Sequence, residues 1–80
     1  MIYSIQLFSE KRTNRRDAFS AERQLVATVK CGELRANGRP IDYALLKTGN
    51  FRANVNFAKV FVLENNGKSC KWRQIEAKMV

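Results

Sequence analysis

The chain has 80 residues, a formal net charge of +8 and 45% hydrophobic residues. This length predicts one domain, residues 1–80, with a thin core, because small domains bury only about 60% of the surface that their unfolded chains expose. The apolar content is too high for a disordered tail, and the longest apolar run, residues 60–63, is far shorter than the roughly 20 residues that cross a membrane. We expect a cytoplasmic protein with no membrane partner, and the thin core leaves room for a homodimer.

The cysteine and histidine content argues against a metal site. Cys31 and Cys70 are the two cysteines and histidine is absent, so no zinc-binding set is available. We expect both thiols to be free and buried in a reducing compartment.

Catalytic signatures are also absent from the sequence. It contains no Gly-rich phosphate loop, paired-Cys cluster or nucleophile elbow, and its seven acidic residues are dispersed along the chain. A ribonuclease that works with Lys, Arg and Tyr alone is the remaining enzymatic alternative. The sequence therefore favours a non-enzymatic protein that uses no cofactor.

The first half of the chain predicts two strands and two loops. Residues 2–8 alternate between apolar and polar side chains, as a half-buried strand does. Residues 9–20 are basic and predict an exposed loop, whereas residues 24–31 are rich in β-branched residues and predict a second strand. A helix that starts at Ser20 is the competing interpretation. Residues 32–39 contain turn-forming residues and predict another loop.

Residues 40–47 predict one short helix. Pro40 suits the first helical turn, and Gly49 offers a C-terminal cap. A helix of about two turns is not stable alone, so the apolar stripe that contains Ile41 and Leu45 must pack on a sheet.

The second half of the chain predicts strands and a hairpin. Residues 51–57 alternate cleanly, with Arg52, Asn54 and Asn56 on a polar face that faces solvent or reads base edges. The apolar parity continues to Leu63, and we predict two strands that join near residues 56–59, because one strand would exceed the usual length.

Asn66 and Gly67 predict the turn of this hairpin, because this dipeptide favours a two-residue type I′ loop. The loop would create the pairs Leu63 with Cys70, Phe61 with Trp72 and Val62 with Lys71. A three-residue loop, which sets Trp72 opposite Val60, is the alternative. We favour the first register because it builds a continuous apolar face, and Trp72 then packs in the core.

These elements predict an α+β fold: a small, mostly antiparallel sheet of four to five strands with one short helix. A small β-barrel is the alternative architecture. The basic loops at residues 9–20 and 32–39 would lie at the ends of the sheet, and the basic hairpin around Asn66 and Gly67 would follow them in the chain.

The positive charge predicts an acidic partner, because it attracts polyanions over long distances. We expect a nucleic-acid-binding module, with RNA or single-stranded DNA favoured over duplex. The alternative is a small modulator or inhibitor that docks its basic surface on an acidic site of a larger protein or nucleoprotein machine. The candidate contacts are Lys11, Arg12, Arg15, Arg16, Arg35, Arg39, Tyr43, Arg52, Lys68, Lys71 and Arg73.

Overall fold

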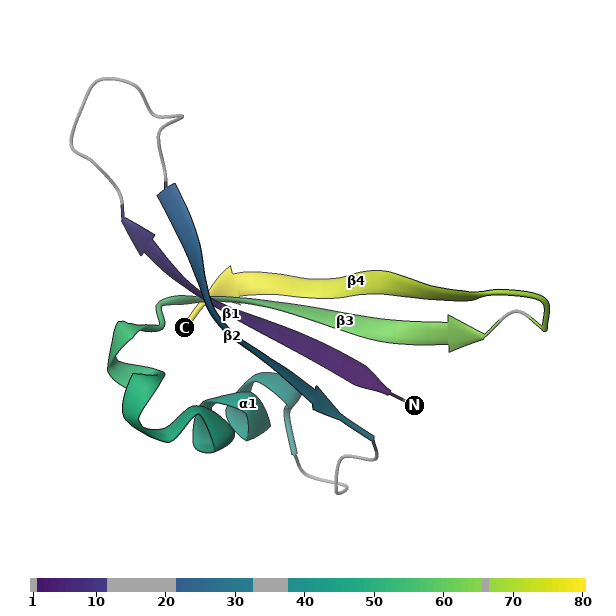
Figure 1. Cartoon of the computed structure of the whole chain (residues 1–80), viewed down its shortest axis with the longest axis horizontal. Coiled ribbons are helices and arrows are strands. Elements are labelled where there is room, and N and C mark those ends of the chain that lie inside the picture. The colour runs from purple at the N-terminus through teal and green to yellow at the C-terminus, as the bar shows by residue number, and fades with distance from the viewer. Residues whose placement is uncertain (1, 12–21, 33–37, 66) are drawn as a thin grey trace.

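The computed structural model describes residues 2–11, 22–32, 38–65 and 67–80, which form four strands and two helical segments (Figure 1). In chain order these are β1 (Tyr3–Lys11), β2 (Glu22–Cys31), the α-helix α1 (Pro40–Thr48), the 3₁₀ helix η1 (Gly49–Asn54), β3 (Phe57–Asn65) and β4 (Cys70–Met79). The strands form one antiparallel sheet in the order β2-β1-β3-β4. The predicted α+β class, a mostly antiparallel sheet of four to five strands with one short helix, is confirmed with four strands, and the sheet does not close into a barrel.

The helix α1 begins at Pro40, as predicted, and ends at Thr48, one residue later than predicted. Pro40 is its first residue, a position at which the missing N–H removes no helical hydrogen bond. The helix stops before Gly49, whose φ of 56° lies in the left-handed region that glycine adopts without a steric penalty.

A layer of apolar side chains fills the space between α1 and the sheet. The helix contributes Ile41, Ala44 and Leu45, which are all buried. The sheet contributes Ile5, Leu7, Cys31, Ala58 and Val60. In Figure 1 the helical segments lie on one side of the sheet, so a single sheet face forms this core.

Both N-terminal strands are longer than predicted. β1 continues to Lys11, because Glu10 pairs with Arg23 of β2 and the two side chains form an ion pair on the same face. The predicted loop at residues 9–20 therefore starts too early, and residues 12–21 lie outside the described residues. The register of β2 shifts between Leu7 and Phe8 of its partner, which moves Leu25 to the opposite face from the core.

The predicted strand at residues 51–57 is wrong. Residues 49–54 form η1, and the N–H of Val55 donates to the carbonyl oxygen of Arg52 at 3.1 Å. This bond joins residues three apart, as in a 3₁₀ turn, so the local backbone bonds of this segment replace the sheet pairing that its alternation predicts. A strand of residues 51–57 is absent, and β3 starts at Phe57 as one continuous strand.

The hairpin of β3 and β4 has a different register from the predicted one. Asn65 pairs with Cys70, and Leu63 pairs with Trp72. Four residues therefore connect the strands instead of two, and the side chain of Asn65 accepts a hydrogen bond from the N–H of Gly67 at 3.1 Å. This local bond makes Asn65 part of the turn closure, in the way that Asn often shapes turns.

The side chain of Trp72 is 44% exposed, so its predicted place in the core is wrong. The register differs by two residues from the prediction, and a shift of two keeps every side chain on its face. Trp72 therefore still shares a face with Phe61 and Leu63, but the helix covers the other face, which carries Val60 and Val62.

The two thiols also differ from each other. Both cysteines are free, as predicted, but only Cys31 is buried, and Cys70 is exposed at the start of β4. Burial raises the pKa of the Cys31 thiol through desolvation. The prediction of two buried thiols holds for one of them.

The neighbours Leu45 and Leu46 test which face of α1 carries the packing energy. Leu45 is 7% exposed and Leu46 is 76% exposed. We expect Leu45→Ala to lower the free energy of unfolding by about 2–5 kcal/mol because it leaves a cavity, and Leu46→Ala to change it by less than about 0.5 kcal/mol. Urea denaturation followed by circular dichroism measures both values. Equal losses would contradict the assigned helix face.

Candidate nucleic-acid interface

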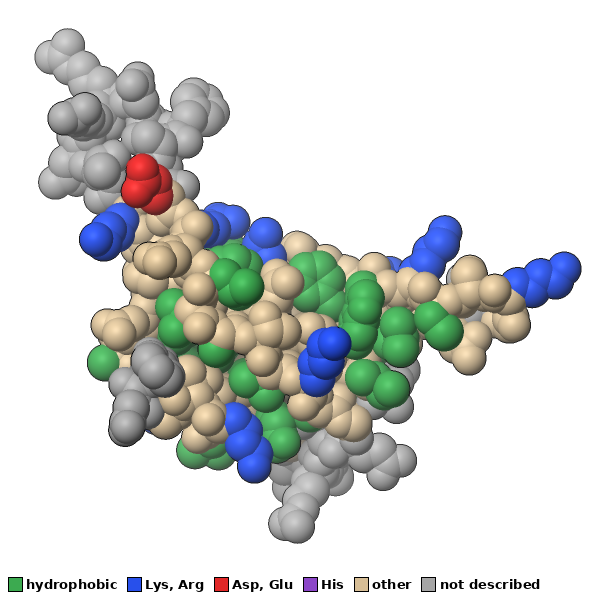
Figure 2. Space-filling model, in the orientation of Figure 1, with side chains coloured by type: hydrophobic (Ala, Val, Ile, Leu, Met, Phe, Trp, Pro, Cys, Tyr) green, Lys and Arg blue, Asp and Glu red, His purple; other side chains and the backbone are tan. Residues whose placement is uncertain are grey.

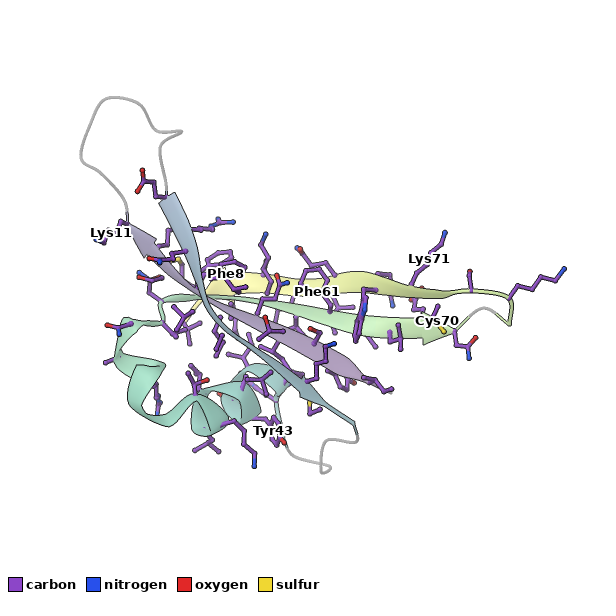
Figure 3. The ribbon with its side chains drawn as sticks, in the orientation of Figure 1. Phe8, Lys11, Tyr43, Phe61, Cys70 and Lys71 are labelled. Atoms are coloured by element: carbon purple, nitrogen blue, oxygen red, sulfur yellow. The ribbon has the colours of Figure 1, made fainter. Side chains whose placement is uncertain are left out.

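The sheet face opposite α1, which we call the open face, carries side chains from all four strands. In each strand these side chains alternate with those that face the helix. By strand they are Ser4, Gln6, Phe8 and Glu10 of β1; Arg23, Leu25, Thr28 and Lys30 of β2; Phe57, Lys59, Phe61 and Leu63 of β3; and Trp72, Gln74, Ala77 and Met79 of β4. Figure 3 shows Phe8 and Phe61 on the sheet away from α1, and Tyr43 on α1 itself.

Large apolar side chains reach solvent on the open face. Leu25 is 51% exposed, Met79 is 49% exposed and Trp72 is 44% exposed. A band of hydrophobic side chains crosses the visible surface of the molecule toward the β3–β4 hairpin, with Lys and Arg beside it (Figure 2). Large apolar side chains that reach solvent together, with charged residues next to them, are typical of interaction sites.

Cations lie above two aromatic rings of the open face, Phe57 and Phe8. The guanidinium carbon of Arg23 lies 3.9 Å from the ring centroid of Phe57, and Phe57 contacts Phe8 edge to face at 6.2 Å. The ammonium of Lys59 lies 5.5 Å from the ring of Phe8. The two cation–ring distances fall within the range of about 6 Å in which cations are attracted to aromatic faces.

The third cation and ring pair lies across the sheet, between its two edge strands. The ammonium of Lys30 on β2 is 6.0 Å from the ring centroid of Trp72 on β4. Beneath them is a hollow of about 280 Å³ that all four strands line. Its lining residues are Ser4, Gln6, Thr28, Lys30, Phe61 and Trp72.

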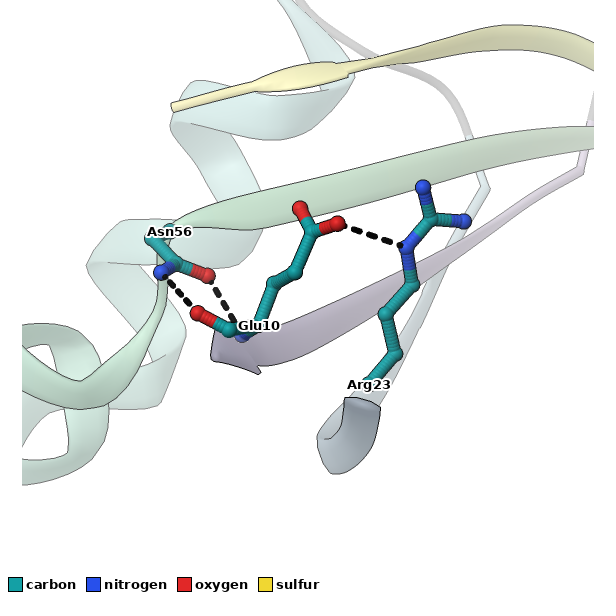
Figure 4. A network of polar contacts seen from close by, with 3 residues as sticks. All are labelled: Glu10, Arg23 and Asn56. Carbon is teal, nitrogen blue, oxygen red and sulfur yellow. Dashed lines mark hydrogen bonds and ion pairs between the residues drawn. The ribbon is translucent and has the colours of Figure 1, made fainter. Parts of the chain in front are cut away.

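A polar network closes the opposite end of the open face (Figure 4). The side chain of Asn56 accepts a hydrogen bond from the N–H of Glu10 at 2.7 Å and donates one to the Glu10 carbonyl oxygen at 2.8 Å. The carboxylate of Glu10 is 3% exposed, and its Oε1 lies 3.5 Å from Nε of Arg23. The network therefore holds the guanidinium of Arg23 over Phe57 and joins β1 to the start of β3.

This arrangement leaves the open face electropositive. Its cations are Arg23, Lys30 and Lys59, and its one acidic side chain, Glu10, is buried against Arg23. The partner of the Glu10 Oε1 atom is therefore a cation of the same face. The two lysines have no carboxylate partner in the described part of the chain.

Seven of the eleven predicted contacts lie within the described residues, and they do not form one cluster. Lys11 lies toward one end of the molecule and Lys71 toward the other (Figure 3). Their separation follows from the antiparallel register, because Tyr3 at the start of β1 pairs with Val62 near the end of β3. The predicted Arg12, Arg15, Arg16 and Arg35 lie outside the described residues.

Four of the predicted contacts lie on the hairpin or on α1. Lys68 and Lys71 are exposed, and Arg73 forms an ion pair with Glu64 on the helix-side face of β4. Tyr43 is half-buried against the core, and the ammonium of Lys47 lies 5.5 Å from its ring.

The positions near α1 and η1 are the last of these contacts. Arg39 and Arg52 are exposed there. Arg52 borders a second hollow, of about 250 Å³, together with Asp42, Leu45 and Leu46. Neither arginine belongs to the open face.

Sequence reasoning missed the three cations of the open face. Arg23, Lys30 and Lys59 are strand residues, whereas most of the predicted basic contacts lie in loops and on the hairpin. The alternation of side chains along β3 puts Lys59 and Phe61 on one face and Val60 on the other. The sequence alone does not show that the helix covers the face with Val60, so it does not show that Lys59 and Phe61 share the uncovered face.

The chain resembles no characterised protein, and its described residues contain no metal-binding cluster. No family model, curated protein or solved structure matches the chain. Among the described residues no three His, Cys, Asp or Glu side chains group as metal ligands do, and no described helix is long and apolar enough to span a membrane.

Asn56 provides a test of the polar network. Asn56→Ala leaves the N–H and the carbonyl of Glu10 without their side-chain partner, so we expect a loss of about 1–3 kcal/mol in the free energy of unfolding. Asn54→Ala, at an exposed position of η1, is the matched control and should change stability by less than about 0.5 kcal/mol. Thermal or urea denaturation measures both variants. A neutral Asn56→Ala would show that the network does not hold β1 to β3.

Proposed function

We propose that the protein binds single-stranded nucleic acid across the open face of its sheet. The observation that carries this proposal is the combination of aromatic rings and cations on one uncovered face: Phe8, Phe61 and Trp72 lie among Arg23, Lys30 and Lys59. Bases stack on aromatic rings with about 1–3 kcal/mol each, and the cations attract the phosphates.

The accessible rings favour a single strand over a duplex. In a duplex the bases are stacked on each other, and a protein reads them through a helix or a β-ribbon in a groove. The one α-helix of the described part packs its apolar stripe into the core. Unpaired bases, in contrast, are free to lie on an aromatic sheet surface.

The basic hairpin extends this surface. Lys68 and Lys71 are exposed at and beside the turn, and the hairpin projects beyond the layer that α1 covers (Figure 1). With a net charge of +8, the protein attracts any polyanion, and the open face then selects chains whose bases are unpaired. RNA and single-stranded DNA both satisfy this chemistry.

Docking on an acidic protein is the alternative that uses the same charges. A protein partner would contact the exposed cations without needing the rings of Phe61 and Trp72. The two hypotheses therefore differ in whether a free oligonucleotide binds at all, and in whether open-face residues contribute to that binding.

Two double variants of lysines test whether binding depends on the open face or only on the overall positive charge. Lys30→Gln with Lys59→Gln removes two charges from the open face, and Lys47→Gln with Lys78→Gln removes two charges from α1 and the helix-side face of β4. Each pair lowers the net charge by the same amount. The binding of a labelled 20-nucleotide single strand is measured by fluorescence anisotropy at several salt concentrations.

We expect the open-face pair to weaken binding at low salt by about tenfold or more, and to reduce the slope of log K against log salt by about 1.4, because each phosphate contact of a single strand contributes about 0.7. The control pair should leave the slope nearly unchanged. Equal effects of both pairs would contradict the open face as the binding surface. Absence of binding by the unmodified protein at low salt would overturn the proposal and leave the protein-docking alternative.

A further inference from the structure

The hollow in the open face has the lining of a site for one base. Its apolar walls are Phe61 and Trp72, which are diagonal neighbours on β3 and β4. Its polar lining comes from the hydroxyls of Ser4 and Thr28 and the amide of Gln6. Ligand sites for drug-sized molecules measure about 300–1,000 Å³, so a hollow of about 280 Å³ suits one planar group and not several.

The polar groups of the hollow are available to a ligand. No hydrogen bond of the described residues uses the side chains of Ser4, Gln6 or Thr28. An amide presents both donors and an acceptor, and hydroxyls can serve as either. A base edge needs this kind of mixed lining, because each base offers its own arrangement of donors and acceptors.

The rigidity of the sheet positions these groups. Gln6 pairs with Thr28 on one side and with Lys59 on the other, and Ser4 pairs with Lys30 and Phe61. Side chains that project from paired strands are held more precisely than side chains on loops. The hydrogen-bonding groups of β1 and β2 therefore face a fixed space beside the rings of β3 and β4.

Lys30 completes the site. Its ammonium is 6.0 Å from the ring of Trp72, at the outer limit of cation–π attraction. The long flexible side chain can therefore move its charge from the ring to a phosphate at small cost when a base enters.

From this geometry we infer that the hollow binds one unpaired nucleobase, with the base stacked on Trp72, its edge hydrogen-bonded by Gln6 and Thr28, and the adjoining phosphate contacted by Lys30. The inference rests on the proposed binding of single strands and adds a reading position to it. The protein then has a base preference at one nucleotide, while the rest of the strand is held through its phosphates and by stacking.

The emission of Trp72, the one tryptophan of the chain, reports on occupancy of the hollow. Single strands of ten nucleotides, each with one kind of base, are compared with an abasic chain of the same length and charge. We expect the base-bearing strands to quench the emission and to bind at least about fivefold more tightly, since base stacking contributes beyond phosphate attraction. The abasic chain should bind through its phosphates and leave the emission unchanged.

Two near-isosteric substitutions test the reading of the base edge. Gln6→Met keeps the volume of the side chain and removes its hydrogen bonds, and Gln74→Met makes the same change on the open face outside the hollow. We expect unmodified protein to bind its preferred homo-oligomer at least about fivefold more tightly than the others. Gln6→Met should abolish this difference, and Gln74→Met should retain it.

The outcomes separate this inference from the proposed function. If base-bearing and abasic chains bind equally and neither quenches the emission, the protein binds nucleic acid and the base site is wrong. If Gln6→Met retains the base preference, the reading role of Gln6 is wrong. If no chain binds at low salt, the proposed function fails and the inference fails with it. Trp72→Phe should retain the advantage of base-bearing strands, and Trp72→Leu should lose it, measured by anisotropy of labelled strands.

Discussion

The structure depends on one packing constraint: a nine-residue helix covers a four-stranded sheet from one side. Such a helix is about 14 Å long, whereas the longest extent of the molecule is 47 Å. Ile41, Ala44 and Leu45 can therefore bury only the middle of one sheet face. The other face and the hairpin beyond the helix remain outside this layer, so Trp72 is exposed and Phe8 and Phe61 are only half-buried.

The positions of the strands and the helix were easier to predict than which side of each strand is buried. The strand in residues 24–31 and the helix at Pro40 follow from local patterns, and the structure contains both. In β3, however, both parities are apolar, since Val60 and Val62 alternate with Phe61 and Leu63. The alternation alone therefore does not show whether the valines or Phe61 and Leu63 are buried. Tertiary packing decides this: the small β-branched side chains lie on the helix side, and the bulky ones lie on the open face.

The candidate site was less predictable for the same reason. Charge is a local property, so the sequence identifies Lys68, Lys71 and Arg73 as cations of a hairpin. Their relation to Lys11 is set by the antiparallel register of β1 and β3, which keeps the two ends of the sheet apart. The pairing of Lys30 with the Trp72 ring joins strands that are not neighbours in the sheet. Such a contact exists only after the strand order is known.

The uncovered aromatic face also has a physical reason to remain folded and available. Rings in water lose the stabilisation that burial would provide. Phe57 is only 8% exposed, and the cations over Phe8, Phe57 and Trp72 attract the π-electrons of their rings. Aromatic side chains have few rotatable bonds, so they lose little entropy when a ligand stacks on them. The hydrogen-bonded strands beneath them keep the backbone in place before binding, which lowers the cost of association. In the described part of the chain no second helical layer covers this face, so the sheet presents its aromatic rings in a fixed arrangement.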